Sequence, residues 1–174
     1  MQKHKIIEAQ QQFIQKLVGK CTHALTLQTN LSTHNINVQK LEQNISLAKG
    51  AMTALKPKFN RLLTGNGHRR KNHHIPIIVV SLEGTLNTYD RNKTLHFHIA
   101  FGNFDNTRLD DEFLEKLKSH WIGTGVGTED IKLDPLIIGR EQGWGSYITK
   151  EAYKGNEQCI DLTNTQVPNH LLVD

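Results

Sequence analysis

Two histidines lie one residue apart in the apolar run Thr94–Phe101, where His96 and His98 alternate with large apolar side chains. If this run is a β-strand, successive side chains point to opposite faces, so the two imidazoles share one face. Two neighbouring polar rings on one face need a polar partner. That partner can be a metal ion, a phosphate group, water or a carboxylate.

A carboxylate is available at Glu83, at the end of the preceding apolar run. If the chain turns tightly over residues 89–92, the two runs form a hairpin with Glu83 opposite His98 and Thr85 opposite His96. In that register Glu83, His96 and His98 supply three ligands for a divalent cation and leave coordination positions open. A slip of one residue would turn Glu83 to the other face. The alternative is an ordinary pair of histidines with an unrelated glutamate.

A second pair of reactive residues follows at Tyr147 and Lys150. On a helix, residues three apart are neighbours on one face, so the phenol and the ammonium group would lie side by side. A phenol is a weak nucleophile near neutral pH because its pKa is about 10. An adjacent ammonium and a metal-polarised phosphate would both favour its attack. The alternative is a tyrosine that only packs between a helix and the sheet.

The formal net charge is +4, and positive charge is concentrated between His68 and His74, where Arg69, Arg70 and Lys71 are consecutive. This segment is either a solvated loop or a loop that contacts phosphates. The two tryptophans have the same two interpretations, core packing or base stacking. We expect Trp121 in the core, and Trp144, between two glycines beside Tyr147, as the better candidate for stacking.

The elements that would position these residues follow from the hydrophobic periodicity. Helical spacing predicts helices over about 3–19, 38–62, 108–121 and 143–153, and the strand-like runs lie over about 22–29, 75–83, 93–101 and 130–138. Pro57 should kink or divide the second helix, whose apolar stripe also resembles a coiled-coil seam. Pro135 suggests an edge strand or a bulge. The predicted class is α+β, with helices packed on the faces of a largely antiparallel sheet.

Length and composition are consistent with one soluble domain over residues 1–174, with a polar, irregular tail from residue 155. The chain has 37% apolar residues, 22% charged residues and two cysteines without metal-binding spacing. We find no apolar run of transmembrane length, no signal-peptide pattern and no phosphate-binding P-loop. A reducing cytoplasm is the expected location.

Three segments, in this order, resemble the motifs of the HUH endonucleases, which include rolling-circle replication initiators, relaxases and transposases. Ala24–Thr29 is similar to the first family motif, an apolar strand with threonines. Leu95–Ile99 matches the histidine–hydrophobic–histidine motif, and Ser146–Glu151 contains the YxxK motif. The resemblance runs from about residue 22 to 154, and the sequence between the motifs is diverged.

The resemblance implies a nickase and strand transferase acting on single-stranded DNA. Mg²⁺ or Mn²⁺ on Glu83, His96 and His98 would bind the scissile phosphate. Tyr147 would attack phosphorus and form a 5′-phosphotyrosine link, assisted by Lys150 as a charge or in deprotonation. Such chemistry initiates rolling-circle replication of a plasmid or phage-like element, with a host helicase acting in trans.

The remaining contacts and the rival functions are less specific. Lys154 adds a nearby positive charge, and Tyr153, six residues after Tyr147, is expected to be structural or DNA-contacting. One alternative function is a non-catalytic origin-binding domain of the same fold. A second is a relaxase or transposase with the same chemistry, and a third is a metal-dependent hydrolase in which Tyr147 is incidental.

Overall fold

A computed structural model of the protein describes residues 2–65, 75–86, 94–137, 141–148, 150–153 and 159–171. The elements in chain order are α1 (Gln2–Val18), β1 (His23–Ser32), α2 (Val38–Thr64), β2 (Ile77–Glu83), β3 (Thr94–Gly102), the 3₁₀ turn η2 (Asn106–Arg108), α3 (Asp111–Ile122), β4 (Gly127–Pro135), α4 (Glu141–Ile148), α5 (Lys150–Tyr153) and the 3₁₀ turn η4 (Asn169–Leu171).

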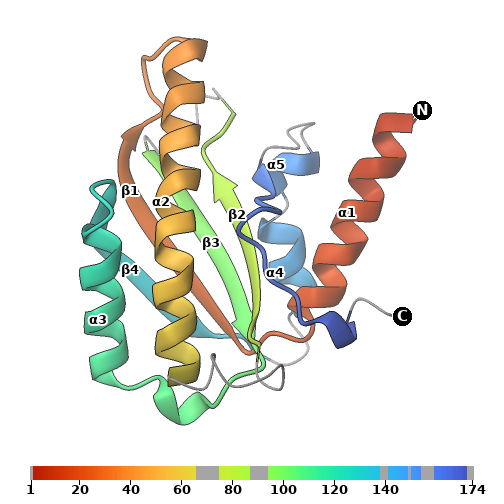
Figure 1. Cartoon of the computed structure of the whole chain (residues 1–174). Coiled ribbons are helices and arrows are strands. Elements are labelled where there is room, and N and C mark those ends of the chain that lie inside the picture. The colour runs from red at the N-terminus through yellow and green to blue at the C-terminus, as the bar shows by residue number, and fades with distance from the viewer. Residues whose placement is uncertain are drawn as a thin grey trace.

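The described strands form one sheet in the order β2-β3-β1-β4, and every neighbouring pair is antiparallel. Helices lie on both faces (Figure 1). The predicted α+β class with an antiparallel sheet is therefore confirmed. β3, which carries both histidines, is an interior strand, and β4 is an edge strand that ends at Pro135, as the proline suggested. None of the described helices is long and apolar enough to span a membrane.

One face of the sheet packs against α2 and α3. The apolar stripe of α2 is buried there from Leu41 to Leu63, together with Phe97 of β3 and Trp121 of α3. Trp121 is fully buried and donates its indole N–H to the Gln28 carbonyl at 2.8 Å, which confirms its expected place in the core. Because the stripe of α2 lies on a sheet, the helix-on-sheet interpretation holds and the coiled coil does not.

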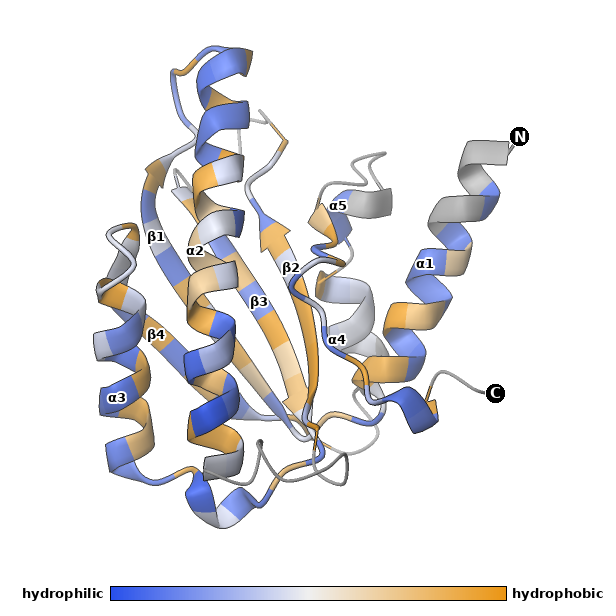
Figure 2. Ribbon diagram, in the orientation of Figure 1, coloured by the Kyte–Doolittle hydropathy of each residue, from blue (hydrophilic) through white to orange (hydrophobic). Residues whose placement is uncertain are grey.

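The opposite face has a second, smaller apolar cluster and the polar residues of interest. Ile14 and Leu17 of α1, Val79 of β2 and Ile148 of α4 pack together near one end of this face. Ser81, Glu83, His96 and His98 continue the same face toward the other end of β2 and β3. β2 is almost uniformly apolar (Figure 2), since it is buried on both sides.

Two predicted elements have different limits. α2 is one continuous helix through Pro57, whose ring is exposed, while Leu55 and Phe59 on either side are fully buried. Burial of the apolar stripe therefore outweighs the one backbone hydrogen bond that proline removes. β4 begins at Gly127, earlier than predicted, because Gly127 pairs with Thr29 of β1. The position requires glycine, since a Cβ there would come 2.3 Å from the Trp121 carbonyl oxygen.

The C-terminal part also departs from the predictions. The helix expected over 143–153 is present as α4 and α5, with Thr149 between them outside the described residues. The described residues of the tail, 159–171, are largely irregular as expected, but they lie along the β2 edge. Ile78 and Gln166 exchange two backbone hydrogen bonds of 2.9 and 2.7 Å, and Asp161 donates to the Val80 carbonyl at 3.0 Å. This pairing covers the edge that β2 would otherwise expose.

Candidate metal and tyrosine site

The pairing of β2 with β3 brings Glu83, His96 and His98 together. Glu83 is opposite His96, and Ser81 is opposite His98. The predicted register, with Glu83 opposite His98 and Thr85 opposite His96, is wrong by two residues. Because side chains alternate with a period of two, the shift leaves Glu83 on the face of the histidines.

The pairing of β2 with β3 ends at Glu83, before the tight turn predicted at 89–92. Residues 87–93 lie outside the described part of the chain. Gly84 follows Glu83 directly with φ of 88°, a conformation that favours glycine. A Cβ at this position would lie 3.1 Å from the Thr94 carbonyl oxygen. Gly84 therefore ends the ladder at Glu83, so the pairing does not continue to Thr85 and the predicted turn as the expected register required.

The three side chains are buried and their polar atoms converge. Glu83 Oε2 lies 2.9 Å from His98 Nε2 and 3.5 Å from His96 Nε2. One ligand atom from each residue lies within 4.8 Å of the others, and all three residues are at most 6% exposed. Two imidazoles and one carboxylate are a donor set that suits first-row divalent ions, so this group can hold a metal ion.

Each imidazole is also held on its other nitrogen. Thr26 Oγ1 lies 3.2 Å from His98 Nδ1, and the Thr94 carbonyl lies 3.4 Å from His96 Nδ1. Partners of this kind fix the ring orientation of metal-binding histidines. Thr26 belongs to β1, the threonine-containing strand that resembles the first family motif. It contacts His98, which belongs to the histidine–hydrophobic–histidine motif.

The protonation states suit a metal ligand set. Burial alone would raise the pKa of Glu83, but hydrogen bonds with His96, His98 and Lys150 outweigh it and hold this pKa well below its usual range. Burial lowers the pKa of His98, an effect that the hydrogen bond to Glu83 only partly offsets. An ionised carboxylate beside a neutral imidazole is the combination that binds a metal ion.

Tyr147 and Lys150 lie next to the group formed by Glu83, His96 and His98. The Tyr147 ring lies 5.1 Å from the His98 ring, centroid to centroid, at an angle of 70°, and the residue is 45% exposed. Lys150 Nζ lies 4.2 Å from the centroid of the Tyr147 ring and 2.6 Å from Glu83 Oε1. The two residues are neighbours as predicted, although they belong to α4 and α5 and not to one helix.

Hydrogen bonds attach α4 to the sheet and to α1. The Ser81 hydroxyl on β2 donates to the Ile148 carbonyl at 2.5 Å, next to Tyr147 in the chain. On the other side, the Gln15 amide of α1 donates to the Ser146 hydroxyl at 3.4 Å. Trp144 is half-buried, with its ring 6.3 Å from that of His98. Tyr147 is therefore flanked on both sides in the chain by anchored residues.

Glu151 is a structural partner of the site that the sequence reasoning missed. Its buried carboxylate accepts from the Gly84 amide at 2.9 Å, from the Thr85 amide at 3.2 Å and from the Thr85 hydroxyl. Lys150 directly precedes Glu151, and Glu83 directly precedes Gly84. The bond between Glu151 and Gly84 therefore holds the backbone on both sides of the Lys150–Glu83 ion pair. Its only signal in the sequence was its place directly after the YxxK motif.

Several predicted DNA contacts lie in parts of the chain that the structure does not describe. Arg69, Arg70, Lys71 and Lys154 lie outside the described residues, as does the side chain of Tyr153. Comparison of the chain with protein-family models, curated proteins and solved structures found no match.

Proposed function

We propose that this protein is a metal-dependent, tyrosine-dependent nickase and strand transferase of single-stranded DNA, of the HUH endonuclease type. The observation that carries the proposal is the placement of a half-exposed phenol directly beside a buried group of two imidazoles and a carboxylate. This adjacency joins two motifs that are about fifty residues apart in the sequence.

Glu83, His96 and His98 would hold a divalent ion, Mg²⁺ or Mn²⁺. When bound, such an ion supplies Lewis-acid polarisation and orientation of the scissile phosphate. The two imidazoles make Mn²⁺ at least as suitable as Mg²⁺, which prefers oxygen ligands. The half-exposed Tyr147 ring lies beside one of the proposed ligands, His98.

Tyr147 is the nucleophile in this proposal. Its Oη forms a bond to phosphorus and loses its proton, while the bond between phosphorus and the 3′ oxygen breaks and that oxygen gains a proton. The products are a 5′-phosphotyrosine link and a free 3′-hydroxyl that can prime synthesis. Attack of a hydroxyl on the link reverses the step and joins strands, so nicking and rejoining are one reaction in two directions.

Lys150 acts as a fixed positive charge. Burial would lower its pKa, but the hydrogen bond and the charge of Glu83, with a smaller contribution from Tyr147, outweigh burial and raise this pKa. A lysine that remains protonated is a poor base and a good neutraliser of developing negative charge on phosphate or phenolate. This favours the electrostatic role over proton abstraction from Tyr147.

The wider biological role follows from the resemblance in sequence. Initiation of rolling-circle replication of a plasmid or phage-like element, with a host helicase in trans, is the form we propose. Trp144, beside the site, is suited to stack a base of the bound strand, a contact worth about 1–3 kcal/mol.

A covalent adduct on a denaturing gel tests the proposal. The protein is incubated with a labelled pool of single-stranded oligonucleotides of random sequence and with Mn²⁺, and a slowly migrating protein–DNA band is expected. Tyr147→Phe should abolish this band, and the matched variant Tyr153→Phe should retain it. An adduct that survives Tyr147→Phe refutes the assignment of the nucleophile. DNA binding without any adduct in the wild type would favour an origin-binding domain.

A further inference from the structure

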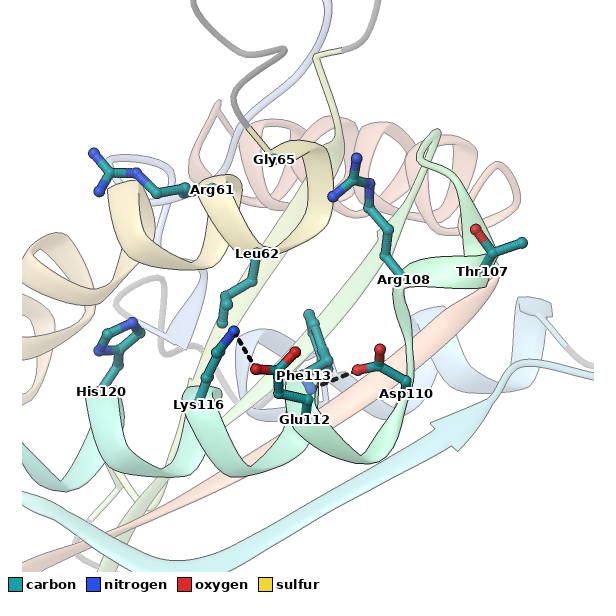
Figure 3. Close-up of a pocket in the computed structure, with 10 residues that line it drawn as sticks. All are labelled: Arg61, Leu62, Gly65, Thr107, Arg108, Asp110, Glu112, Phe113, Lys116 and His120. Atoms are coloured by element: carbon teal, nitrogen blue, oxygen red, sulfur yellow. Dashed lines mark hydrogen bonds and ion pairs between the residues drawn. The ribbon is translucent and has the colours of Figure 1, made fainter.

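A pocket lies on the opposite face of the sheet from the metal and tyrosine site. It opens between the C-terminal part of α2, the turn η2 and α3, with a cavity volume of ≈ 450 Å³ (Figure 3). Leu62 and Phe113 contribute apolar surface, and Arg61, Arg108, Lys116 and His120 stand around it. We call it the α2/α3 pocket.

The charges around the α2/α3 pocket are unbalanced. Two acidic residues line it among those that the structure describes, and both are engaged. Asp110 accepts from the Phe113 amide at 2.7 Å as the N-cap of α3, and Glu112 pairs with Lys116 at 2.7 Å. Among the described residues, no carboxylate forms an ion pair with Arg61 or with Arg108. Two guanidinium groups at this pocket therefore have no ion-pair partner among the described residues, although the charge of Arg108 helps to lower the pKa of the exposed Asp105 carboxyl next to η2.

The shape of the pocket leaves the Arg108 guanidinium close to the backbone. A Cβ at Gly65 would come 2.8 Å from an Arg108 nitrogen, so the glycine at the end of α2 makes room for this group. Gly65 has φ of 60°, which independently favours glycine. The Thr107 side chain lines the same side.

His120 lines the other side of the pocket, where Lys58 and Arg61 carry positive charge. Burial lowers the pKa of His120, and the nearby charges of Lys58 and Arg61 lower it further. Lys58 and Arg61 therefore lie near His120 on this side of the pocket, and a bound anion would offset the positive charge of these two side chains.

We propose that the α2/α3 pocket binds phosphate groups and, if the proposed function holds, that these belong to the backbone of the DNA strand outside the scissile position. Guanidinium groups bind phosphate oxygens through paired N–H donors, which suits Arg61 and Arg108. Apolar surface from the half-buried Leu62 suits the sugar or base of the same nucleotide. The enzyme would hold its DNA on both faces of the sheet.

Binding of the phosphate group is tested without DNA. The metal-free protein in EDTA is titrated with inorganic pyrophosphate, and the backbone amide signals are followed by NMR. We expect saturable shifts at Gly65, Thr107 and His120, and loss of these shifts in Arg61→Ala/Arg108→Ala. Lys5→Ala/Lys16→Ala removes the same charge from exposed positions on α1 and should leave them unchanged. Absence of shifts in the wild type overturns the pocket as a phosphate site.

The source of the phosphate is tested by the salt dependence of DNA binding. With a single-stranded oligonucleotide of roughly 16 nucleotides, loss of two phosphate contacts should lower the slope of log K against log salt by about 1.4, at about 0.7 per contact. We expect this for Arg61→Ala/Arg108→Ala and not for Lys5→Ala/Lys16→Ala. An unchanged slope, with pyrophosphate shifts present, overturns DNA as the ligand and points to a free polyphosphate. The Tyr147 adduct is a separate readout, so the pocket can fail while the nickase stands.

Discussion

Removal of the Glu151 carboxylate should destabilise the protein and loosen the site. Glu151→Ala removes the carboxylate that accepts from the Gly84 amide, the Thr85 amide and the Thr85 hydroxyl. Hydrogen bonds to a charged acceptor contribute about 1.5–3 kcal/mol each. Thr85 is buried, but Gly84 is half-buried and water can reach it, so the three losses do not add in full. We expect a loss of about 3 kcal/mol in the free energy of unfolding.

Urea denaturation followed by circular dichroism measures this loss. With an m-value of about 2 kcal/mol/M, a loss of about 3 kcal/mol moves the midpoint down by about 1.5 M at unchanged m. The matched control is Glu115→Ala, which removes an exposed carboxylate of α3 and should change stability by less than about 0.5 kcal/mol. If Glu151→Ala shifts the midpoint no more than the control, the contact between α5 and the end of β2 is absent in solution and our account of how Lys150 is positioned fails.

Four further results are expected. Mn²⁺ at a hundred times its dissociation constant should stabilise the wild type by about 2.7 kcal/mol in a thermal melt; His98→Ala should remove this, and equal stabilisation would refute the site. Because the native pKa values of Glu83 and His98 lie below their ordinary values of 4.5 and 6.5, the unfolded chain binds more protons in acid, so urea midpoints should fall as pH drops below about 6.5 and again below about 4.5; midpoints that rise on acidification contradict these directions. Burial raises the pKa of Cys21 to about 12, so its thiol should react with a disulfide reagent at pH 8 only after denaturation; rapid labelling of the native protein would contradict its burial. Lys150→Ala should slow adduct formation and Lys150→Arg should restore part of it, since a charge is required; no rescue by arginine would argue against a purely electrostatic role.

Much of the fold followed from local patterns. The alternation of His96 and His98 with apolar neighbours predicted a strand over 93–101, and β3 lies within a residue of these limits. The spacing of apolar residues likewise predicted the buried stripe of α2. Such patterns are reliable because burial of one apolar face contributes most to the stability of each element.

The parts that could not be predicted depend on contacts between distant segments. The end of the β2–β3 ladder is set by Gly84 and by its bond to Glu151, a residue 67 positions away along the chain. The pairing of the C-terminal segment with Ile78 and Val80 has no periodic signature either, because it uses isolated bridges and side-chain hydroxyls. Turn residues and alternation alone gave no information on either.

The two oxygens of Glu83 explain why the tyrosine and the histidines form one site. Oε2 faces both imidazoles, at 2.9 and 3.5 Å, and Oε1 faces the Lys150 ammonium at 2.6 Å. The lysine in turn lies against the Tyr147 ring. A single carboxylate thus fixes the position of the Lys150 ammonium relative to the imidazoles. A register slip of one residue would have removed Glu83 from this face and separated the two halves, whereas the observed two-residue shift preserved both contacts.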